Sequence, residues 1–127
     1  MPVFEFVRLG IACTVQTRNK SRLDNYRRDL RRIALGLWDG NTAPVVLPVR
    51  VVISYYYTSD VLDVDNIIKP ILDALNGLVY QDDLQVVRVV SQKMRVLDRA
   101  LLPVASPVLS AGLRSRDDFL HVLVEWE

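Results

Sequence analysis

A run of β-branched and aromatic residues at positions 45–58 constrains the fold more than any other feature of the sequence. Such residues favour extended chain, in which successive side chains point to opposite faces. The run therefore predicts one long strand within a sheet. One predicted face carries Val49, Val51, Ile53, Tyr55 and Tyr57, and the other carries Arg50, Val52, Ser54 and Tyr56.

A helix is predicted from Ser21 to just before residues 39–41, an Asp-Gly-Asn cluster that is typical of turns. Ser21 can begin the helix, because Asp24 three residues later approximates a capping box. Apolar residues then recur at spacings of three and four, which gives the helix one face toward the core. That face carries Leu23, Tyr26, Leu30, Ile33, Ala34 and Leu37, and the opposite face carries Arg27, Arg28, Arg31 and Arg32.

A second helix is predicted to begin near Asp65 or Asn66, either of which can cap it. Pro70 follows early in this helix, so a modest kink is expected there. Asn76-Gly77 supplies a left-handed exit from the helix. The inward face carries Ile67, Ile68, Ile71, Leu72 and Leu75.

The remaining stretches predict strands and one loop. Residues 3–15 predict one or two strands, and residues 86–97 and 119–126 predict one strand each. Residues 98–118 contain two prolines, a glycine and several serines, which predicts a long loop with one helical turn at most. In a chain of 127 residues, half of them hydrophobic, these elements predict a single α+β domain over residues 1–127, with a mixed sheet packed against two main helices.

Charge is segregated along the chain, although the net charge is only +1. Residues 16–32 hold seven basic and two acidic side chains, a local net charge of +5. Residues 60–83 hold six acidic side chains and one basic side chain, a local net charge of −5. This distribution suits a protein that grips a polyanion with one surface and holds cations with another.

Several classes of protein are disfavoured. The longest charge-free stretch, residues 100–113, has only 14 residues and contains two prolines, whereas a membrane-spanning helix needs about 20 apolar residues. No secretory signal is evident, so a cytoplasmic protein is expected. Cys13 lies in an apolar run and is expected to be a buried hydrophobic side chain. His121 is expected in the core or on the surface and not as a ligand, which disfavours catalysis by a Ser-His or Cys-His system in this chain.

The densest group of chemically active residues is the segment 63–69 (DVDNIIK), followed by Asp82-Asp83. Mg²⁺ prefers carboxylate oxygens in octahedral array, and aspartates from separate short segments can supply them. Asp63 and Asp65, two apart in an extended segment, project to the same side. Lys69 falls one helical turn beyond Asp65, where its ammonium can neutralise phosphate charge. The group is a candidate site for a divalent cation.

Each part of this group also has a structural explanation. Asp65 or Asn66 can be a helix cap, and Asp82-Asp83 can be a solvated turn. Lys69 can form surface pairs with Asp65 or Asp73. A calcium loop of the EF-hand type is excluded, because isoleucine occupies the position that needs glycine.

The joint pattern D-x-D-N-x-x-K-x-x-x-D-x-L-N-G at 63–77, followed by D-D-x-Q-V at 82–86, resembles the RusA-type Holliday junction resolvases, small endonucleases of bacteria and their phages. The resemblance implies a RusA-like fold and a homodimer. It also implies metal-binding or catalytic roles for Asp63, Asp65 and Asp83, and a catalytic role for Lys69. Asp73 matches a frequent acidic position of the family.

The function expected from the resemblance is Mg²⁺-dependent cleavage of branched DNA, above all of four-way junctions, in recombination and repair, with Mn²⁺ as an alternative ion. Two strands must be cut, so a two-fold dimer that matches the symmetry of the junction is expected. Such a protein would be associated with the nucleoid of a bacterium or act for a phage, with no membrane partner. The candidate DNA contacts, which can also form no more than a solvated face, are Arg18, Lys20, Arg22, Arg27, Arg28, Arg31 and Arg32.

Two other classes of function stay open. The first is a non-catalytic DNA-binding protein, such as a prophage remnant, in which the acidic group is vestigial. The intact set of Asp63, Asp65, Lys69 and Asp83 argues against it. The second is a Mg²⁺-dependent hydrolase of nucleotides or other small phosphates, for which the basic segment has no evident purpose.

Overall fold

The computed structural model describes residues 2–14, 17–38, 42–58, 62–95, 106–115 and 117–127. Four strands form one sheet in the order β1-β4-β2-β3, where β1 is Val3–Leu9, β2 is Val49–Tyr57, β3 is Val86–Arg95 and β4 is Phe119–Trp126. β4 runs antiparallel to both β1 and β2, whereas β2 and β3 are parallel. The predicted mixed sheet and α+β class are confirmed.

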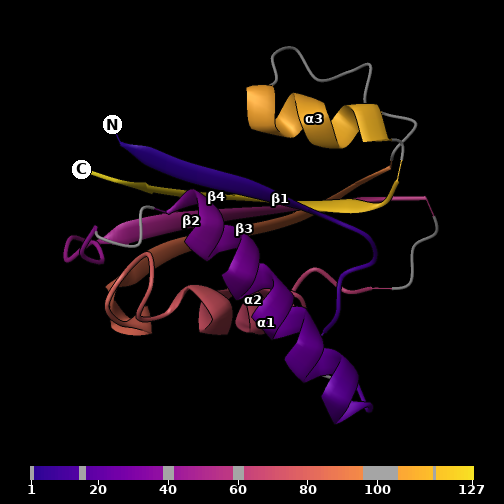
Figure 1. The fold of residues 1–127 in the computed structure, drawn as a ribbon, viewed down its shortest axis with the longest axis horizontal. Coiled ribbons are helices and arrows are strands. Elements are labelled where there is room, and N and C mark those ends of the chain that lie inside the picture. Colours follow the sequence, from indigo (N-terminus) through magenta and orange to yellow (C-terminus); the bar gives the residue numbers. More distant parts are fainter. Residues whose placement is uncertain (1, 15–16, 39–41, 59–61, 96–105, 116) are drawn as a thin grey trace.

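Helices cover both faces of the sheet (Figure 1). α1 (Lys20–Leu37) and α2 (Ile68–Leu75) lie on one side, and α3 (Pro107–Ser115) lies on the other. The side toward α1 and α2 holds the main core. The alternation predicted along β2 is confirmed there, because Val49, Val51, Ile53 and Tyr55 are each at most 2% exposed. On the opposite face, Tyr56 stacks on Phe119 with ring centroids 4.5 Å apart.

α2 lies in the connection between the parallel strands β2 and β3. Parallel neighbours need such a crossover, because the chain must return to the end of the sheet at which the first strand began. Residues 62–67 therefore lie after the end of β2 and before α2. Asp83 begins η1 (Asp83–Gln85), the short 3-10 helix that leads into β3. The crossover thus carries the residues of the family pattern from Asp63 to Gln85.

α1 begins one residue earlier than predicted, and its cap is a different residue. Asn19 is the N-cap, and its side-chain oxygen accepts a hydrogen bond from the Arg22 amide at 3.0 Å. Asparagine caps helices as well as serine does, so the earlier residue takes the position that the sequence assigned to Ser21. The inward face is confirmed at Leu23, Tyr26, Leu30 and Ala34.

The last turn of α1 departs from the predicted inward face. Leu37 is 59% exposed, and the C-cap residue Trp38 is buried in its place. Trp38 packs edge-to-face on Phe4 of β1 and on Trp126 of β4. The large ring fills the space at the end of the helix, which leaves Leu37 outside. The turn predicted at 39–41 lies outside the described residues.

α2 begins at Ile68, later than predicted, and neither Asp65 nor Asn66 caps it. Residues 64–67 form a turn instead, in which the Asn66 amide donates to the Asp63 carbonyl at 3.1 Å. Pro70 then falls in the first turn of the helix, where a missing N–H breaks no intrahelical bond, so the reason for expecting a kink disappears. The left-handed exit is confirmed, since Gly77 has a φ of 78°.

The C-terminal third contains more helix than predicted. Residues 107–115 form α3, although the sequence there predicts a loop with one helical turn at most. Pro107 is acceptable because it occupies the first helical position, after Ser106, whose hydroxyl accepts from the Leu109 amide at 3.1 Å. Gly112 is needed for packing, because a Cβ there would meet the Phe119 ring at 2.6 Å.

Three strands also differ from expectation in extent. The run at 45–58 forms a strand only at Val49–Tyr57, which is β2. Within the described residues 3–14, β1 is the one strand, and it ends at Leu9 before Gly10, which has a φ of 105°. β3 ends at Arg95, and the predicted continuation to residue 97 lies outside the described residues. Cys13 is buried, as predicted. In the described part of the chain, no helix combines the length and the apolar character that crossing a membrane requires.

Candidate active site

Two carboxylates are presented by the acidic loop, the name used here for residues 62–67. Asp63 and Asp65 are both exposed, and within the described residues neither carboxylate has an ion-pair or hydrogen-bond partner. The ends of the loop are fixed, because Leu62 packs against the core and Ile67 is fully buried. The two carboxylates of the loop therefore face solvent, while both ends of the loop are packed against the core.

The strand that precedes the acidic loop is fixed by Asp118, at the junction of α3 and β4. Its Oδ1 accepts hydrogen bonds from the Thr58 amide at 3.0 Å and from the Thr58 hydroxyl at 2.8 Å. Its Oδ2 accepts one from the Tyr55 hydroxyl at 3.2 Å. Burial, with the neighbouring Asp118 carboxylate, raises the pKa of Tyr55 to about 12, so this hydroxyl remains a donor at neutral pH. Asp118 ties the end of β2 to the rest of the sheet.

Lys69 and Asp73 lie on one face of α2, next to α1. The Lys69 ammonium is 3.2 Å from Asp73 Oδ1, and the Arg27 guanidinium of α1 is 3.5 Å from Asp73 Oδ2. The surface pair that the sequence offered as an alternative for Lys69 is therefore present. The Lys69 side chain is nevertheless 68% exposed, so its ammonium also faces solvent.

Asp83 is half-buried, and the hydroxyl of Tyr80 contacts its carboxylate. The hydroxyl of the fully buried Tyr80 lies 3.2 Å from Asp83 Oδ1 and 3.1 Å from the Leu72 carbonyl of α2, and its single proton is shared between these acceptors. Burial, with the nearby Asp83 carboxylate, raises the pKa of Tyr80 well above its usual range, so the hydroxyl stays protonated. Asp82 caps η1 in a capping box with Gln85, so the acidic pair is more than a solvated turn.

The structure brings these predicted residues together in part. Asp63 and Asp65 share one loop. Asp83 lies next to α2 instead, because the Tyr80 hydroxyl contacts both its carboxylate and the carbonyl of Leu72, one turn beyond the start of α2. Across the described ranges, no three His, Cys, Asp or Glu side chains gather closely enough to hold a metal ion. Mg²⁺ is commonly bound by one or two carboxylates together with water and substrate phosphates, and the exposed pair on the acidic loop fits that donor set. Participation of Asp83 stays a prediction.

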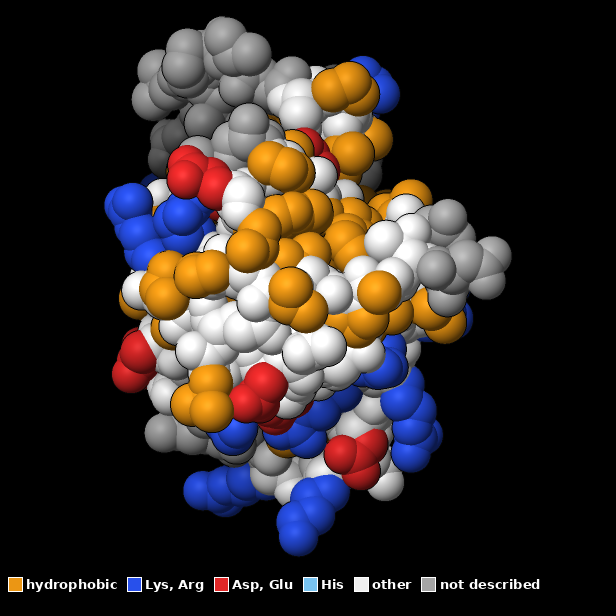
Figure 2. All heavy atoms as spheres, turned by 90° about the vertical axis from the view of Figure 1, so that its left-hand side faces the viewer, with side chains coloured by type: hydrophobic (Ala, Val, Ile, Leu, Met, Phe, Trp, Pro, Cys, Tyr) orange, Lys and Arg blue, Asp and Glu red, His pale blue; other side chains and the backbone are white. Residues whose placement is uncertain are grey.

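The seven candidate DNA contacts divide into two groups. Arg27 pairs with Asp24 and Asp73, and Arg31 donates to the Ala74 and Asn76 carbonyls at 3.0 Å each, where it caps the C-terminus of α2. These two arginines therefore connect α1 to α2. The other five are exposed on α1 or just before it, and Figure 2 shows basic side chains gathered toward the lower end of the molecule. They are Arg18, Lys20, Arg22, Arg28 and Arg32.

An open hollow of about 900 Å³ lies between the end of β1 and the first half of α1. Its polar lining includes Arg22, Asn19 and Asn25, all exposed. Its lining also includes Arg8, which pairs with Asp29 at 2.8 Å and lies over the Tyr26 ring at 4.5 Å. The sequence did not indicate this hollow, because it forms between segments that carry no joint motif.

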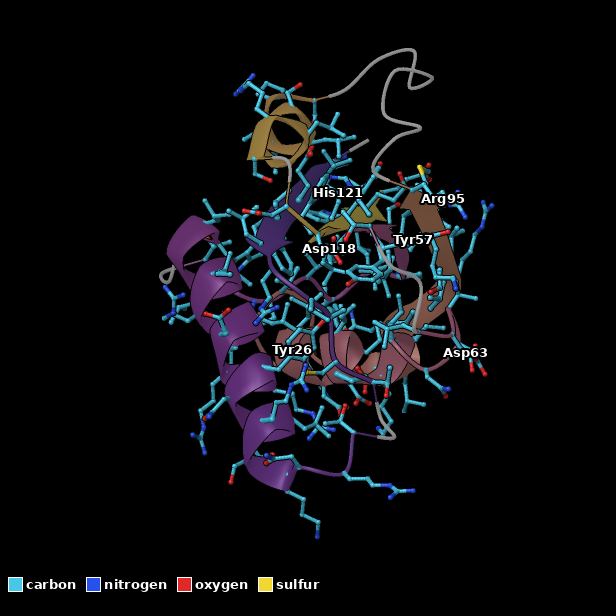
Figure 3. The ribbon with its side chains drawn as sticks, turned by 90° about the vertical axis from the view of Figure 1, so that its right-hand side faces the viewer. Tyr26, Tyr57, Asp63, Arg95, Asp118 and His121 are labelled. Carbon is cyan, nitrogen blue, oxygen red and sulfur yellow. The ribbon has the colours of Figure 1, made fainter. Side chains whose placement is uncertain are left out.

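His121 is a core residue, in agreement with the sequence. Its Nε2 donates to Glu5 Oε1 at 3.0 Å, and the Ser106 hydroxyl donates to the same oxygen. Figure 3 shows His121 near the start of α3, well away from Asp63. This cluster joins β1, β4 and α3 and stands apart from the acidic loop.

Sequence comparison identifies a family over most of the chain. A family model described as endodeoxyribonuclease RusA matches residues 6–100, which include Asp63, Asp65, Lys69 and Asp83. No curated protein sequence matches the chain.

Proposed function

The chain belongs to the RusA family of endodeoxyribonucleases, and from that premise we propose that it cuts branched DNA, above all four-way junctions, in a Mg²⁺-dependent reaction. The observation that carries the proposal is the exposed, unpartnered pair Asp63 and Asp65 in the described part of the chain, inside the segment that the family model matches. Carboxylate oxygens without protein partners can bind a divalent cation together with water and a phosphate of the DNA.

In this proposal, Asp63 and Asp65 hold the ion, and Mn²⁺ can replace Mg²⁺. Asp83 is a further predicted ligand, although in the described part of the chain it does not gather with the other two into a three-carboxylate group. A bound ion of this kind activates water and stabilises charge on phosphorus. Lys69 lies on the exposed face of α2 that follows the acidic loop. Its ammonium stabilises the charge that develops on the phosphate oxygens, and Asp73 keeps the side chain over this face.

The basic side chains of α1 hold the DNA backbone in the proposed complex. Arg18, Lys20 and Arg22 are exposed around the start of the helix, and Arg22 also lines the hollow beside β1. Contacts of this kind go to phosphates and position the duplex without reading its sequence. A protein with this activity would be found at the nucleoid.

A homodimer follows from the reaction, because one acidic loop makes one cut and a resolved junction needs two. An apolar end of the molecule supports it. The strands β1, β2 and β3 begin at the same end of the sheet, where α1 finishes, and Figure 2 shows hydrophobic side chains gathered on that face. A second copy can cover its exposed apolar residues. They include Val3, Leu37, Val46, Leu47 and Val87.

The decisive experiment compares a labelled four-way junction with a linear duplex of the same sequence, each with and without Mg²⁺. We expect paired nicks in the junction only, and only with the ion. Binding without cutting would favour the non-catalytic DNA-binding protein. Failure to bind either DNA, with hydrolysis of a small phosphate ester, would favour the small-phosphate hydrolase.

A further inference from the structure

Two side chains of β3 bind the backbone of the acidic loop immediately before its two aspartates. The Ser91 hydroxyl donates to the Val64 carbonyl at 2.5 Å, and the Lys93 ammonium donates to the Leu62 carbonyl at 2.7 Å. The two donors are alternate residues of one strand, and the two acceptors are alternate residues of the loop. The contacts therefore form a matched pair that fixes the peptide units leading into Asp63 and Asp65.

The alternation of side chains along β3 places Ser91 and Lys93 on the same side of the sheet as the acidic loop. Side chains at 89, 91 and 93 share the side of the sheet that faces α2, and Val89 packs there against the core. Lys93 also lies over the ring of Tyr57, with 5.7 Å between its ammonium and the ring centroid. Figure 3 looks onto this end of the sheet and shows Tyr57 and Arg95 at the ends of neighbouring strands, with Asp63 on the same side.

The loop needs such support, because its own hydrogen bonding is sparse. Within the described residues, its one internal backbone bond runs from the Asn66 amide to the Asp63 carbonyl. The N-terminal end of α2 has no side-chain cap. Without Ser91 and Lys93, the peptides before Asp63 and Asp65 would exchange these partners for water and the carboxylates could turn.

We propose that Ser91 and Lys93 are positioning residues, which hold the acidic loop so that the Asp63 and Asp65 carboxylates present a joint binding site for a divalent cation. The inference rests on the proposed function of the loop and deepens it. Groups that orient metal ligands typically affect metal affinity or activity by about 10 to 100-fold. Neither residue needs to touch the ion or the DNA.

The test uses the full chain and the variants Ser91→Ala and Lys93→Met, which remove the two donors and keep the strand. Arg88→Met is the matched control, since Arg88 is an exposed cation of the same strand on the opposite face. Mn²⁺ binding without DNA is followed by the paramagnetic resonance of the free ion. We expect both variants to bind Mn²⁺ at least about tenfold more weakly than the control, and Lys93→Arg, which keeps a donor, to recover most of the loss.

Two further measurements on the same proteins separate the explanations. Hydrogen exchange at the Asn66 amide should become faster in both variants, because the turn it closes loses its support. Single-turnover cutting of the junction should slow while junction affinity stays unchanged. Unchanged Mn²⁺ binding and unchanged exchange in both variants would overturn the proposal. Weaker junction binding by Lys93→Met, with normal Mn²⁺ binding, would overturn it in favour of a direct DNA contact.

The result also separates the positioning role from the proposed function. If the unmodified protein binds Mn²⁺ and the variants do not, but no protein cuts DNA, the positioning role stands and the nuclease proposal fails. If the unmodified protein cuts the junction and the variants cut it equally well with normal Mn²⁺ binding, the nuclease proposal stands and the positioning role fails.

Discussion

Asp63 and Asp65 of the acidic motif differ from Asp73 and Asp83 in what surrounds their carboxylates. The first two are exposed and have no side-chain partner among the described residues, whereas Lys69 and Arg27 hold Asp73 and Tyr80 holds Asp83. A carboxylate with protein partners contributes to packing between elements, and a carboxylate without them keeps its oxygens for a ligand. The contrast separates charges that shape the fold from charges that are available for chemistry.

The largest effect is expected at the free pair. Asp63→Asn and Asp65→Asn keep the size of the side chain and remove the charge, so junction cutting should fall at least about 100-fold. Junction binding should be kept, since these groups repel phosphate. Thermal unfolding should move little, because surface changes without partners typically alter the free energy of unfolding by less than about 0.5 kcal/mol. Normal cutting by both variants would remove the acidic loop from the mechanism.

Asp83→Asn sharpens the comparison, because Asp83 is both held and a predicted ligand. The amide oxygen can still accept from the Tyr80 hydroxyl, so the fold should be kept. Loss of cutting equal to that of Asp63→Asn would place Asp83 in the metal site. Cutting at the normal rate would leave it as a support for the start of β3.

Lys69 is the next largest test, because its ammonium contacts Asp73 but remains mostly exposed. As a surface pair it would add only about 0.3 to 0.5 kcal/mol to stability, and Lys69→Ala would cut normally. As a cation that acts on the transition state, it should matter far more. We expect Lys69→Ala to fold, to bind the junction and to cut at least about tenfold more slowly under single-turnover conditions.

The same contrast applies to the basic residues of α1 and predicts a smaller effect, on affinity. Reversing two exposed charges, Arg22→Glu and Arg28→Glu, should flatten the dependence of junction binding on salt, by roughly 0.9 in log-log slope for each phosphate that the protein no longer neutralises. Arg31→Gln should instead leave the slope unchanged and lower the melting temperature, since Arg31 donates to carbonyls of α2. An unchanged slope for the double variant would make these residues a solvated face.

The sequence predicted the strands and the inward helix faces, but it did not predict side-chain contacts between distant segments. Strands, inward helix faces and the acidic motif follow from local patterns, because periodicity and spacing are properties of neighbouring residues. Ser91 and Lys93 are different, since they donate to backbone carbonyls 27 and 31 residues earlier. Every residue has a backbone carbonyl, so no residue type marks the acceptor. The same reason hid the contacts of Arg31.

The errors at element ends have related causes. Pro107 and Gly112 favour a loop by residue type, but the first occupies the start of α3 and the second makes room for Phe119. Asn19 and Ser21 are equally good caps by residue type, so residue type alone does not show that Asn19 is the cap. Residue type alone does not distinguish a glycine that ends a helix from a glycine that lets the helix pack closely against an aromatic ring.

The smallest effect concerns a held carboxylate far from the acidic loop. Burial raises the pKa of Glu5, but hydrogen bonds from Ser106 and His121 outweigh it and hold the pKa below its ordinary value of 4.5. A group whose pKa is lower in the folded state contributes stability above its unfolded pKa and loses it as pH falls through the folded value. Resistance to thermal unfolding should therefore weaken as pH falls below about 4.5, and Glu5→Gln should reduce this dependence, because glutamine keeps an acceptor without titrating. Equal acid sensitivity in the two proteins would show that other carboxylates, such as Asp29 with its lowered pKa between Arg32 and Arg8, dominate the acid transition.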